Sequence, residues 1–208
     1  MTDNPNLACN NSTWITQWID HSNHSLGTFQ QQVQVVTDFY KPGGPILLFQ
    51  GEESIAMICV LGGIAAAIEH RYFGNSTPFG PDQSYTQKGF RYLTLDNIMD
   101  DTALFIEQMQ KNISGASKSP AIVASGSYGG FLVTALRLNR PNSIYGAIAA
   151  APPILGFLTG DGNVAERFNW WNWISNAVSD KSAEAASVAK KAFTTLQQVL
   201  QSGKSLEP

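Results

Sequence analysis

The stretch Ala121–Leu132, AIVASGSYGGFL, places a serine between a buried strand and a helix. It starts with a short apolar run typical of a strand that is covered on both faces. A sharp turn from such a strand into a helix lifts one hydroxyl, here that of Ser127, above the sheet, with the next backbone amide beside it. Gly126 and Gly129 flank Ser127, and we expect strand and helix to come too close there for side chains. The stretch therefore predicts a turn that presents Ser127 as a nucleophile.

The histidines of the chain come before this serine in the sequence, and not after it. All three precede Ser127 in the sequence: His21, His24 and His70. Folds with this turn supply their acid and their base after the serine. We therefore expect the chain to be the front part of a serine hydrolase that lacks the triad Asp and His.

Two backbone amides are expected to hold the developing negative charge. The amide of Tyr128 is one candidate, and Glu52 is the other, because the loop after the Ile46–Phe49 run should supply the second donor. The alternative for Glu52 and the adjacent Glu53 is a solvated loop. Ser125 stands where the pattern G-x-S-x-G has its first glycine, so the motif is not complete.

Aromatic residues leave two interpretations open. Phe131 lies one helical turn after Ser127, so it either lines a substrate pocket or packs in the core. Trp170, Trp171 and Trp173 either pack against other helices or line a cleft.

His70 has no second residue at a spacing typical of metal ligands. This favours a hydrogen-bonded structural histidine over a metal ligand, and we expect no metal or other cofactor.

The composition excludes several classes of protein. With 208 residues, 43% of them apolar, the chain can bury one sizeable core. A net charge of −3 without a basic run argues against a nucleic-acid partner. No apolar stretch is long enough to span a bilayer, and the N-terminus shows no signal peptide. Cys9 and Cys59 decide nothing about the compartment.

Acceptor sequences for N-glycosylation point to a secretory route. They begin at Asn10, Asn11, Asn23, Asn75 and Asn112. We take Asn11, Asn23, Asn75 and Asn112 as the candidate sites. The alternative is a surface that is merely rich in Asn and Ser.

Strand and helix patterns alternate along the chain. We predict an early edge strand, four further strands and two helices: Gln30–Phe39, Ile46–Phe49, Ala65–Ile68, Ala121–Ala124 and Ile144–Ala151 for the strands, and Thr94–Ile113, capped by Thr94, and Tyr128–Leu138 for the helices. This alternation favours an α/β fold with a parallel sheet and helices on both faces. Gly51–Gly63 is so short that any helix in it must be very short.

The pattern changes beyond Gly160. Val164–Asn176 is rich in aromatic residues, and Ser182–Leu200 reads as a helix. We therefore divide the chain into a core at 1–157 and the beginning of a helical subdomain at 158–208.

Several motifs, in order, resemble one family of serine exopeptidases. Glu69–Gly80, EHRYFGNSTPFG, is similar to the family sequence EHRYYG-x-S-x-PFG. Further matching segments are Asp20–Asn23, Phe29–Gln31, Gly44–Ile46, Gly51–Glu52, Tyr92–Thr94, Gly126–Gly130 and Gly146–Pro152. The family is that of lysosomal Pro-X carboxypeptidase and dipeptidyl peptidase II, with many secreted fungal members. The resemblance covers about residues 14–160.

The resemblance implies an α/β-hydrolase core with an inserted helical cap, and cleavage of peptides beside proline. It places Ser127 on the nucleophile, Tyr128 on the oxyanion donor and Phe131 near the proline pocket. It also implies a secreted, vacuolar or lysosomal protein, and we add a homodimer of the full-length protein as an expectation. Departures from the family are Ser125, the short Gly51–Gly63 segment, and the absent signal peptide, acid and histidine, which together suggest a truncated form.

Three functions remain open at this point. The first is a serine exopeptidase, carboxypeptidase or dipeptidyl peptidase, of which this chain is an inactive front part. The second is a non-catalytic chain that binds a peptide or a partner, although an uncovered sheet edge argues against its stability. The third is a lipase or esterase, which shares the serine turn but not the EHRY-like segment.

Overall fold

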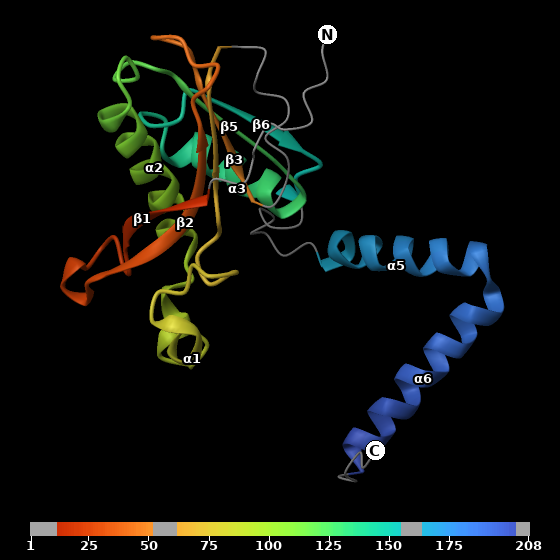
Figure 1. Ribbon diagram of the computed structural model, residues 1–208. Helices are drawn as coiled ribbons and strands as arrows, with labels where there is room; N and C mark the ends of the chain where they lie inside the picture. The colour runs from red at the N-terminus through yellow and green to blue at the C-terminus, as the bar shows by residue number, and fades with distance from the viewer. Residues whose placement is uncertain (1–11, 52–61, 155–163, 203–208) are drawn as a thin grey trace. The chain divides into compact units, whose positions relative to one another are not determined.

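The computed structural model describes residues 12–51, 62–154 and 164–202, with the side chains of 164–171 excepted. The chain forms two compact units, Met1–Pro153 and Ile154–Pro208, and each is treated by itself. The first unit carries the sheet and Ser127, and the second is helical (Figure 1).

The first unit is built on a six-stranded sheet with the order β1-β2-β4-β3-β5-β6. β1 and β2 form an antiparallel hairpin, β2 is antiparallel to β4, and β4, β3, β5 and β6 run parallel to their neighbours. The strands are β1 (Ser12–Trp18), β2 (Thr28–Val36), β3 (Ile46–Gln50), β4 (Ile64–Ile68), β5 (Ala121–Gly126) and β6 (Gly146–Ala150).

This topology confirms the α/β-hydrolase core expected from the sequence. β3 lies between β4 and β5 in the sheet, so the strand order does not follow the sequence at this point. The helix α3 starts directly after β5, which places Ser127 at the carboxyl end of the parallel strands. The prediction of an edge position for the Gln30–Phe39 strand is wrong, because β1 pairs along the outer side of β2. Residues 52–61, between β3 and β4, lie outside the described ranges.

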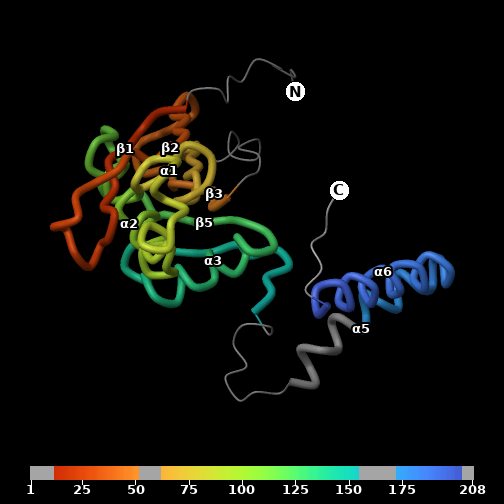
Figure 2. The backbone as a smooth tube through the Cα atoms, turned by 90° about the horizontal axis from the view of Figure 1, so that it is seen from below, coloured from red at the N-terminus to blue at the C-terminus, as the bar shows by residue number. Residues whose placement is uncertain are grey.

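Two helices cover one face of this sheet. They are α2 (Leu95–Asn112) and α3 (Ser127–Asn139), and they contact each other (Figure 2). Alternate strand residues point into the same core cluster as apolar residues of both helices, among them Leu48, Ile68, Val123, Phe105 and Val133. Thr94 caps α2 as predicted, accepting a hydrogen bond from the Asn97 amide at 3.2 Å. Helices on the opposite face stay a prediction.

A buried ion pair joins the hairpin, α2 and the segment after β4. Arg71, with no exposed surface, donates from Nε and Nη2 to the two oxygens of Asp101 at 2.7 and 2.6 Å. His21 lies 2.8 Å from Asp101 Oδ1. Gln17 donates to the Asp101 carbonyl at 2.8 Å and Gln31 donates to the carbonyl of Glu69 at 2.7 Å. The guanidinium also donates to the carbonyls of Trp18, Ile19 and Tyr92.

The second unit consists of α5 (Val164–Lys181) and α6 (Ala183–Gln201). Ser182 caps α6 by accepting from the Ala185 amide at 3.1 Å. Trp173 is exposed, whereas the side chains of Trp170 and Trp171 lie outside the described part of the chain. Among the described residues, no helix combines the length and the apolar character that crossing a membrane requires.

Candidate active site

The sharp turn predicted at Ser127 is present. Ser127 is the first residue of α3, follows β5 directly, and has a φ of 51°, the left-handed region that residues other than glycine seldom adopt. The residue is exposed. The amide of Tyr128 belongs to the first turn of α3, where backbone N–H groups have no partner within the helix. This amide is therefore free to bind an anion beside the Ser127 hydroxyl.

Only one of the two glycines expected to allow close packing does so at this turn. A Cβ on Gly129 would lie 2.0 Å from Ser125 Oγ and 2.7 Å from the Gln50 carbonyl oxygen. A Cβ on Gly126 would come no closer than 3.7 Å to another group, which is ordinary contact. Gly130 is the second tight position, with the Ala150 carbonyl 2.9 Å from such a Cβ. The start of α3 therefore lies tightly against the end of β3 at Gly129 and against the end of β6 at Gly130.

We expect Gly129→Ala to destabilise the protein and Gly126→Ala to leave it nearly unchanged. The added methyl group at Gly129 meets backbone that cannot move aside, and overpacking of this kind costs about 1–3 kcal/mol. At Gly126 we expect less than about 0.5 kcal/mol. Urea unfolding of the two variants measures both values. Equal losses in the two variants would contradict this account of the turn.

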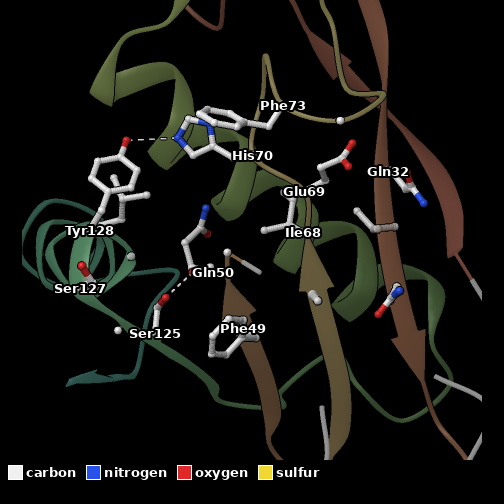
Figure 3. Close-up of a pocket in the computed structure, with 18 of the residues that line it drawn as sticks. Gln32, Phe49, Gln50, Ile68, Glu69, His70, Phe73, Ser125, Ser127 and Tyr128 are labelled. Atoms are coloured by element: carbon white, nitrogen blue, oxygen red, sulfur yellow. Dashed lines mark hydrogen bonds between the residues drawn. The ribbon is translucent and has the colours of Figure 1, made fainter. Parts of the chain in front are cut away.

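Ser125 fixes the turn to the end of β3. Its hydroxyl donates to the backbone carbonyl of Gln50 (Figure 3). The Gln50 amide oxygen accepts from Thr102 Oγ1 at 2.6 Å. A glycine at position 125 would lack this contact. The departure from the G-x-S-x-G pattern therefore adds a link between β5 and the end of β3.

An open pocket of about 790 Å³ lies over the carboxyl ends of β3, β4 and β5 (Figure 3). Ser127, Tyr128, Gly51, His70 and Phe73 are among the residues that line it. Phe131 is not among them, and its ring stacks on that of Tyr128 with centroids 6.5 Å apart. Glu52 lies outside the described residues, but the neighbouring Gly51 places the start of its loop at the pocket.

The histidine rings bond elsewhere. His70 Nδ1 lies 2.7 Å from the Arg71 carbonyl and Nε2 lies 3.2 Å from the Tyr128 hydroxyl. His21 bonds to Asp101, and His24 stacks on Trp18 with centroids 4.0 Å apart. Among the described residues, no hydrogen bond joins a histidine to Ser127.

Burial determines the charge state of the His70–Tyr128 pair. A carbonyl oxygen only accepts, so Nδ1 of His70 carries the hydrogen and Nε2 of the neutral ring accepts from the phenol. Desolvation lowers the pKa of His70, against a smaller opposing effect of its hydrogen bond to Arg71. Desolvation also raises the pKa of Tyr128. Both groups are therefore neutral at pH 7.

The remaining predicted sites lie away from the pocket or on its rim. Asn23, Asn75 and Asn112 are exposed, and Asn11 falls outside the described ranges. Asn23 Oδ1 accepts from the Ser25 hydroxyl at 2.7 Å, within its own acceptor sequence. Within the described ranges, no group of three or more His, Cys, Asp or Glu side chains is placed to hold a metal ion.

Comparison with known proteins gives this geometry its context. The family model described as serine carboxypeptidase S28 matches residues 17–207. The chain belongs to this family. The lysosomal Pro-X carboxypeptidase of Homo sapiens is 33% identical over 171 residues, which cover 75% of this chain and 34% of that protein. The chain thus spans about a third of the length of such curated relatives.

Two other similar proteins share a lower sequence identity with this chain. A probable extracellular serine carboxypeptidase of the fungus Arthroderma benhamiae is 29% identical, over 62% of this chain and 20% of that protein. The crystal structure of a carboxyl esterase from Bacillus coagulans matches with a TM-score of 0.46 and 15% identity, over 65% of this chain and 43% of that one. These S28 relatives are thus described as lysosomal in one case and extracellular in another.

Each residue of the EHR segment of this S28 chain makes a defined contact, and the hydrogen-bonded role predicted for His70 is observed. Glu69 Oε2 accepts from the amides of Asn75 and Ser76 and from the Ser76 hydroxyl, which shapes the following loop. His70 reaches the residue after Ser127, and Arg71 forms the buried ion pair. Only the resemblance marked the segment as a whole, and the partners of His70 and Arg71, Tyr128 and Asp101, lie 58 and 30 residues further along the chain.

Proposed function

We propose that the protein is a serine exopeptidase that hydrolyses peptide bonds next to proline, with Ser127 as its nucleophile. The observation that carries the proposal is the exposed Ser127 at φ 51° beside a pocket, in a chain of the S28 family. The left-handed backbone supports this role, because strain of this kind is typical of functional positions.

The proposed reaction uses the groups of the turn directly. Ser127 Oγ attacks the peptide carbonyl carbon while a base takes its proton. The resulting oxyanion binds the Tyr128 amide, with a second donor proposed from the loop that begins at Gly51. The carbon–nitrogen bond then breaks, the proton passes to the leaving amine, and water hydrolyses the acyl-serine ester.

We propose that the acid and the base come from outside residues 1–208. His21 and His70 each use ring nitrogens for other contacts, and His24 stacks on an indole. A histidine from another part of the protein would have open access to the exposed Ser127 hydroxyl. Residues 158–208 are, in this proposal, the beginning of a helical cap subdomain.

The relatives support the proposed substrate class and location. A Pro-X carboxypeptidase name on a relative with 33% identity supports peptides that contain proline. We propose a secreted, vacuolar or lysosomal protein that carries glycans at Asn11, Asn23, Asn75 and Asn112, and that forms a homodimer at full length. Exposure of the latter three asparagines supports the glycan sites.

Residues 1–208 alone are expected to show no turnover of a proline-containing fluorogenic peptide, and the full-length protein is expected to hydrolyse it. A serine hydroxyl without a base is a poor nucleophile near neutral pH. A fluorophosphonate probe should label Ser127 strongly only in the full-length protein. A peptide with a blocked N-terminus and one with a free N-terminal dipeptide separate carboxypeptidase from dipeptidyl peptidase activity.

Two outcomes would contradict the proposal. Hydrolysis of a simple ester without hydrolysis of either peptide would favour an esterase. Robust turnover by residues 1–208 that disappears in Ser127→Ala would show that a base lies within these residues.

A non-catalytic binding protein is the second candidate. It is favoured by the engagement of the His21 and His70 rings away from Ser127. A full-length protein that binds a proline-containing peptide, measured by calorimetry, but neither cleaves it nor reacts with fluorophosphonate would establish this alternative.

A further inference from the structure

A hydrogen bond across 58 residues of sequence links the segment after β4 to the nucleophile turn. The Tyr128 hydroxyl lies 3.2 Å from Nε2 of His70 (Figure 3). Tyr128 directly follows Ser127, and its amide is the one that faces the developing oxyanion in the proposed reaction. Any group that fixes Tyr128 therefore affects the position of the amide that binds the oxyanion, without contacting the substrate itself.

The acceptor nitrogen of His70 is itself fixed in space. Its other nitrogen is held by the Arg71 carbonyl at 2.7 Å, which sets the tautomer. Phe73 packs its ring edge-on to the imidazole, with an interplanar angle of 84° and centroids 4.9 Å apart. The next residue is the fully buried Arg71, bound through two nitrogens to Asp101. The imidazole thus extends from a rigid part of the core toward the turn.

We propose that His70 is a positioning residue for the attack by Ser127, acting through the phenol of Tyr128. Tyr128 is 47% exposed, and its ring also stacks on that of Phe131, so the bond to His70 adds a polar restraint at the end of a half-buried side chain. The bond holds the residue after the nucleophile while the backbone of Ser127 stays in its left-handed conformation. The inference rests on the proposed function, because it assigns a role within the same site.

The direction of the bond depends on the charge of the imidazole. Protonation gives Nε2 a hydrogen that the phenol oxygen can accept, and the Tyr128 hydroxyl then no longer has the ring as its acceptor. Two charged groups act on His70: Asp101 on α2 favours protonation of the ring, and the neighbouring Arg71 opposes it. Glu69 precedes His70 in the sequence. On α3, the ring of His70 contacts the neutral phenol of Tyr128. Burial lowers the pKa of His70, so the acceptor persists into mildly acidic solution and is lost as the pH falls through that pKa.

The kinetic test compares variants of similar size in the full-length protein. His70→Leu removes the acceptor, and His70→Gln offers an amide oxygen near the position of Nε2. We expect His70→Leu and Tyr128→Phe each to lower kcat about fivefold to tenfold with little change in KM, the size typical of one lost hydrogen bond. His70→Gln should restore most of the rate. The double variant His70→Leu/Tyr128→Phe should be no slower than either single variant.

A second measurement does not depend on activity. In protein with isotope-labelled histidine, NMR should show His70 in the Nδ1-protonated form at pH 7. Tyr128→Phe should raise the pKa of His70, because it removes a donor to the neutral ring. An unchanged pKa of His70 in Tyr128→Phe would overturn the proposal, and this test works even if the protein shows no turnover.

The outcomes separate this proposal from the proposed function. If Ser127→Ala keeps the activity of the unmodified protein, the proposed function fails, and the NMR result alone decides whether His70 holds Tyr128. If Ser127→Ala abolishes activity while His70→Leu keeps kcat, or raises only KM, the positioning role is wrong. Losses that multiply in the double variant would also overturn it, since they would show two independent effects.

Discussion

Replacing Ser127 by alanine is expected to lower the kcat of the full-length protein by about 10³-fold or more on a proline-containing peptide. The hydroxyl is the group that forms the covalent bond in the proposed mechanism, and the other serine of the turn, Ser125, is buried. Activity that remains comes from the oxyanion donors and substrate binding alone. Single-turnover kinetics, with loss of fluorophosphonate labelling, measure the effect.

Ser125→Ala is the matched control for this prediction. Ser125 lies two residues earlier, and its hydroxyl is buried against the Gln50 carbonyl instead of facing a substrate. We expect a loss of less than about tenfold, the size that follows from one broken hydrogen bond. Equal losses in the two variants would mean that the turn as a whole, and not the Ser127 hydroxyl, limits the rate.

Asp101→Asn is expected to destabilise the protein by about 3–5 kcal/mol. The substitution keeps the shape of the side chain but leaves the guanidinium of Arg71, which has no exposed surface, without its counter-charge. Breaking a buried ion pair by removal of one partner has an effect of this size, because the remaining charge is desolvated and unpaired. Urea unfolding at pH 7 measures the change in the free energy of unfolding.

Asp100→Asn serves as the control on the same helix. Asp100 accepts a hydrogen bond from Arg140 Nε at 2.6 Å, but both side chains of this pair remain partly exposed, at 31% and 27%. Solvent screens such a pair, so its loss should lower the free energy of unfolding by less than about 1 kcal/mol. Equal effects at positions 100 and 101 would show that the buried ion pair is not what joins the hairpin to α2.

The strands and helices with a clear apolar pattern were predictable from the sequence. β3 and β4 are continuous apolar runs, and α2 carries its apolar residues at helical spacing. β1 was missed because Gln17 occupies an inward position where the pattern calls for an apolar residue. The prediction for β2 began two residues late and ended three residues late, at Phe39 instead of Val36, and Gln31 within it is also buried. Both glutamines are buried because they hydrogen bond near the Arg71–Asp101 pair, which no local pattern reveals.

The serine turn was predictable, and the surroundings of the turn were not. Glycine spacing after an apolar strand indicates the position of Ser127, because the turn depends on the local backbone. The contacts of Tyr128 with His70 and of Ser125 with the Gln50 carbonyl join segments that are 58 and 75 residues apart. Which segments meet at the turn depends on the order of the strands in the sheet, and that order is a property of the whole fold.

The left-handed backbone at Ser127 limits which amino acids can occupy the position. A φ of 51° is tolerated by a side chain with a single heavy atom on Cβ, but it is a severe outlier for a β-branched residue. Threonine, although it carries a hydroxyl, would bring its extra methyl group against the strained backbone. Cysteine has the same unbranched shape as serine and fits without that penalty. Among the small hydroxyl and thiol side chains, the geometry of the turn therefore admits serine and cysteine at this position and disfavours threonine, whatever the substrate.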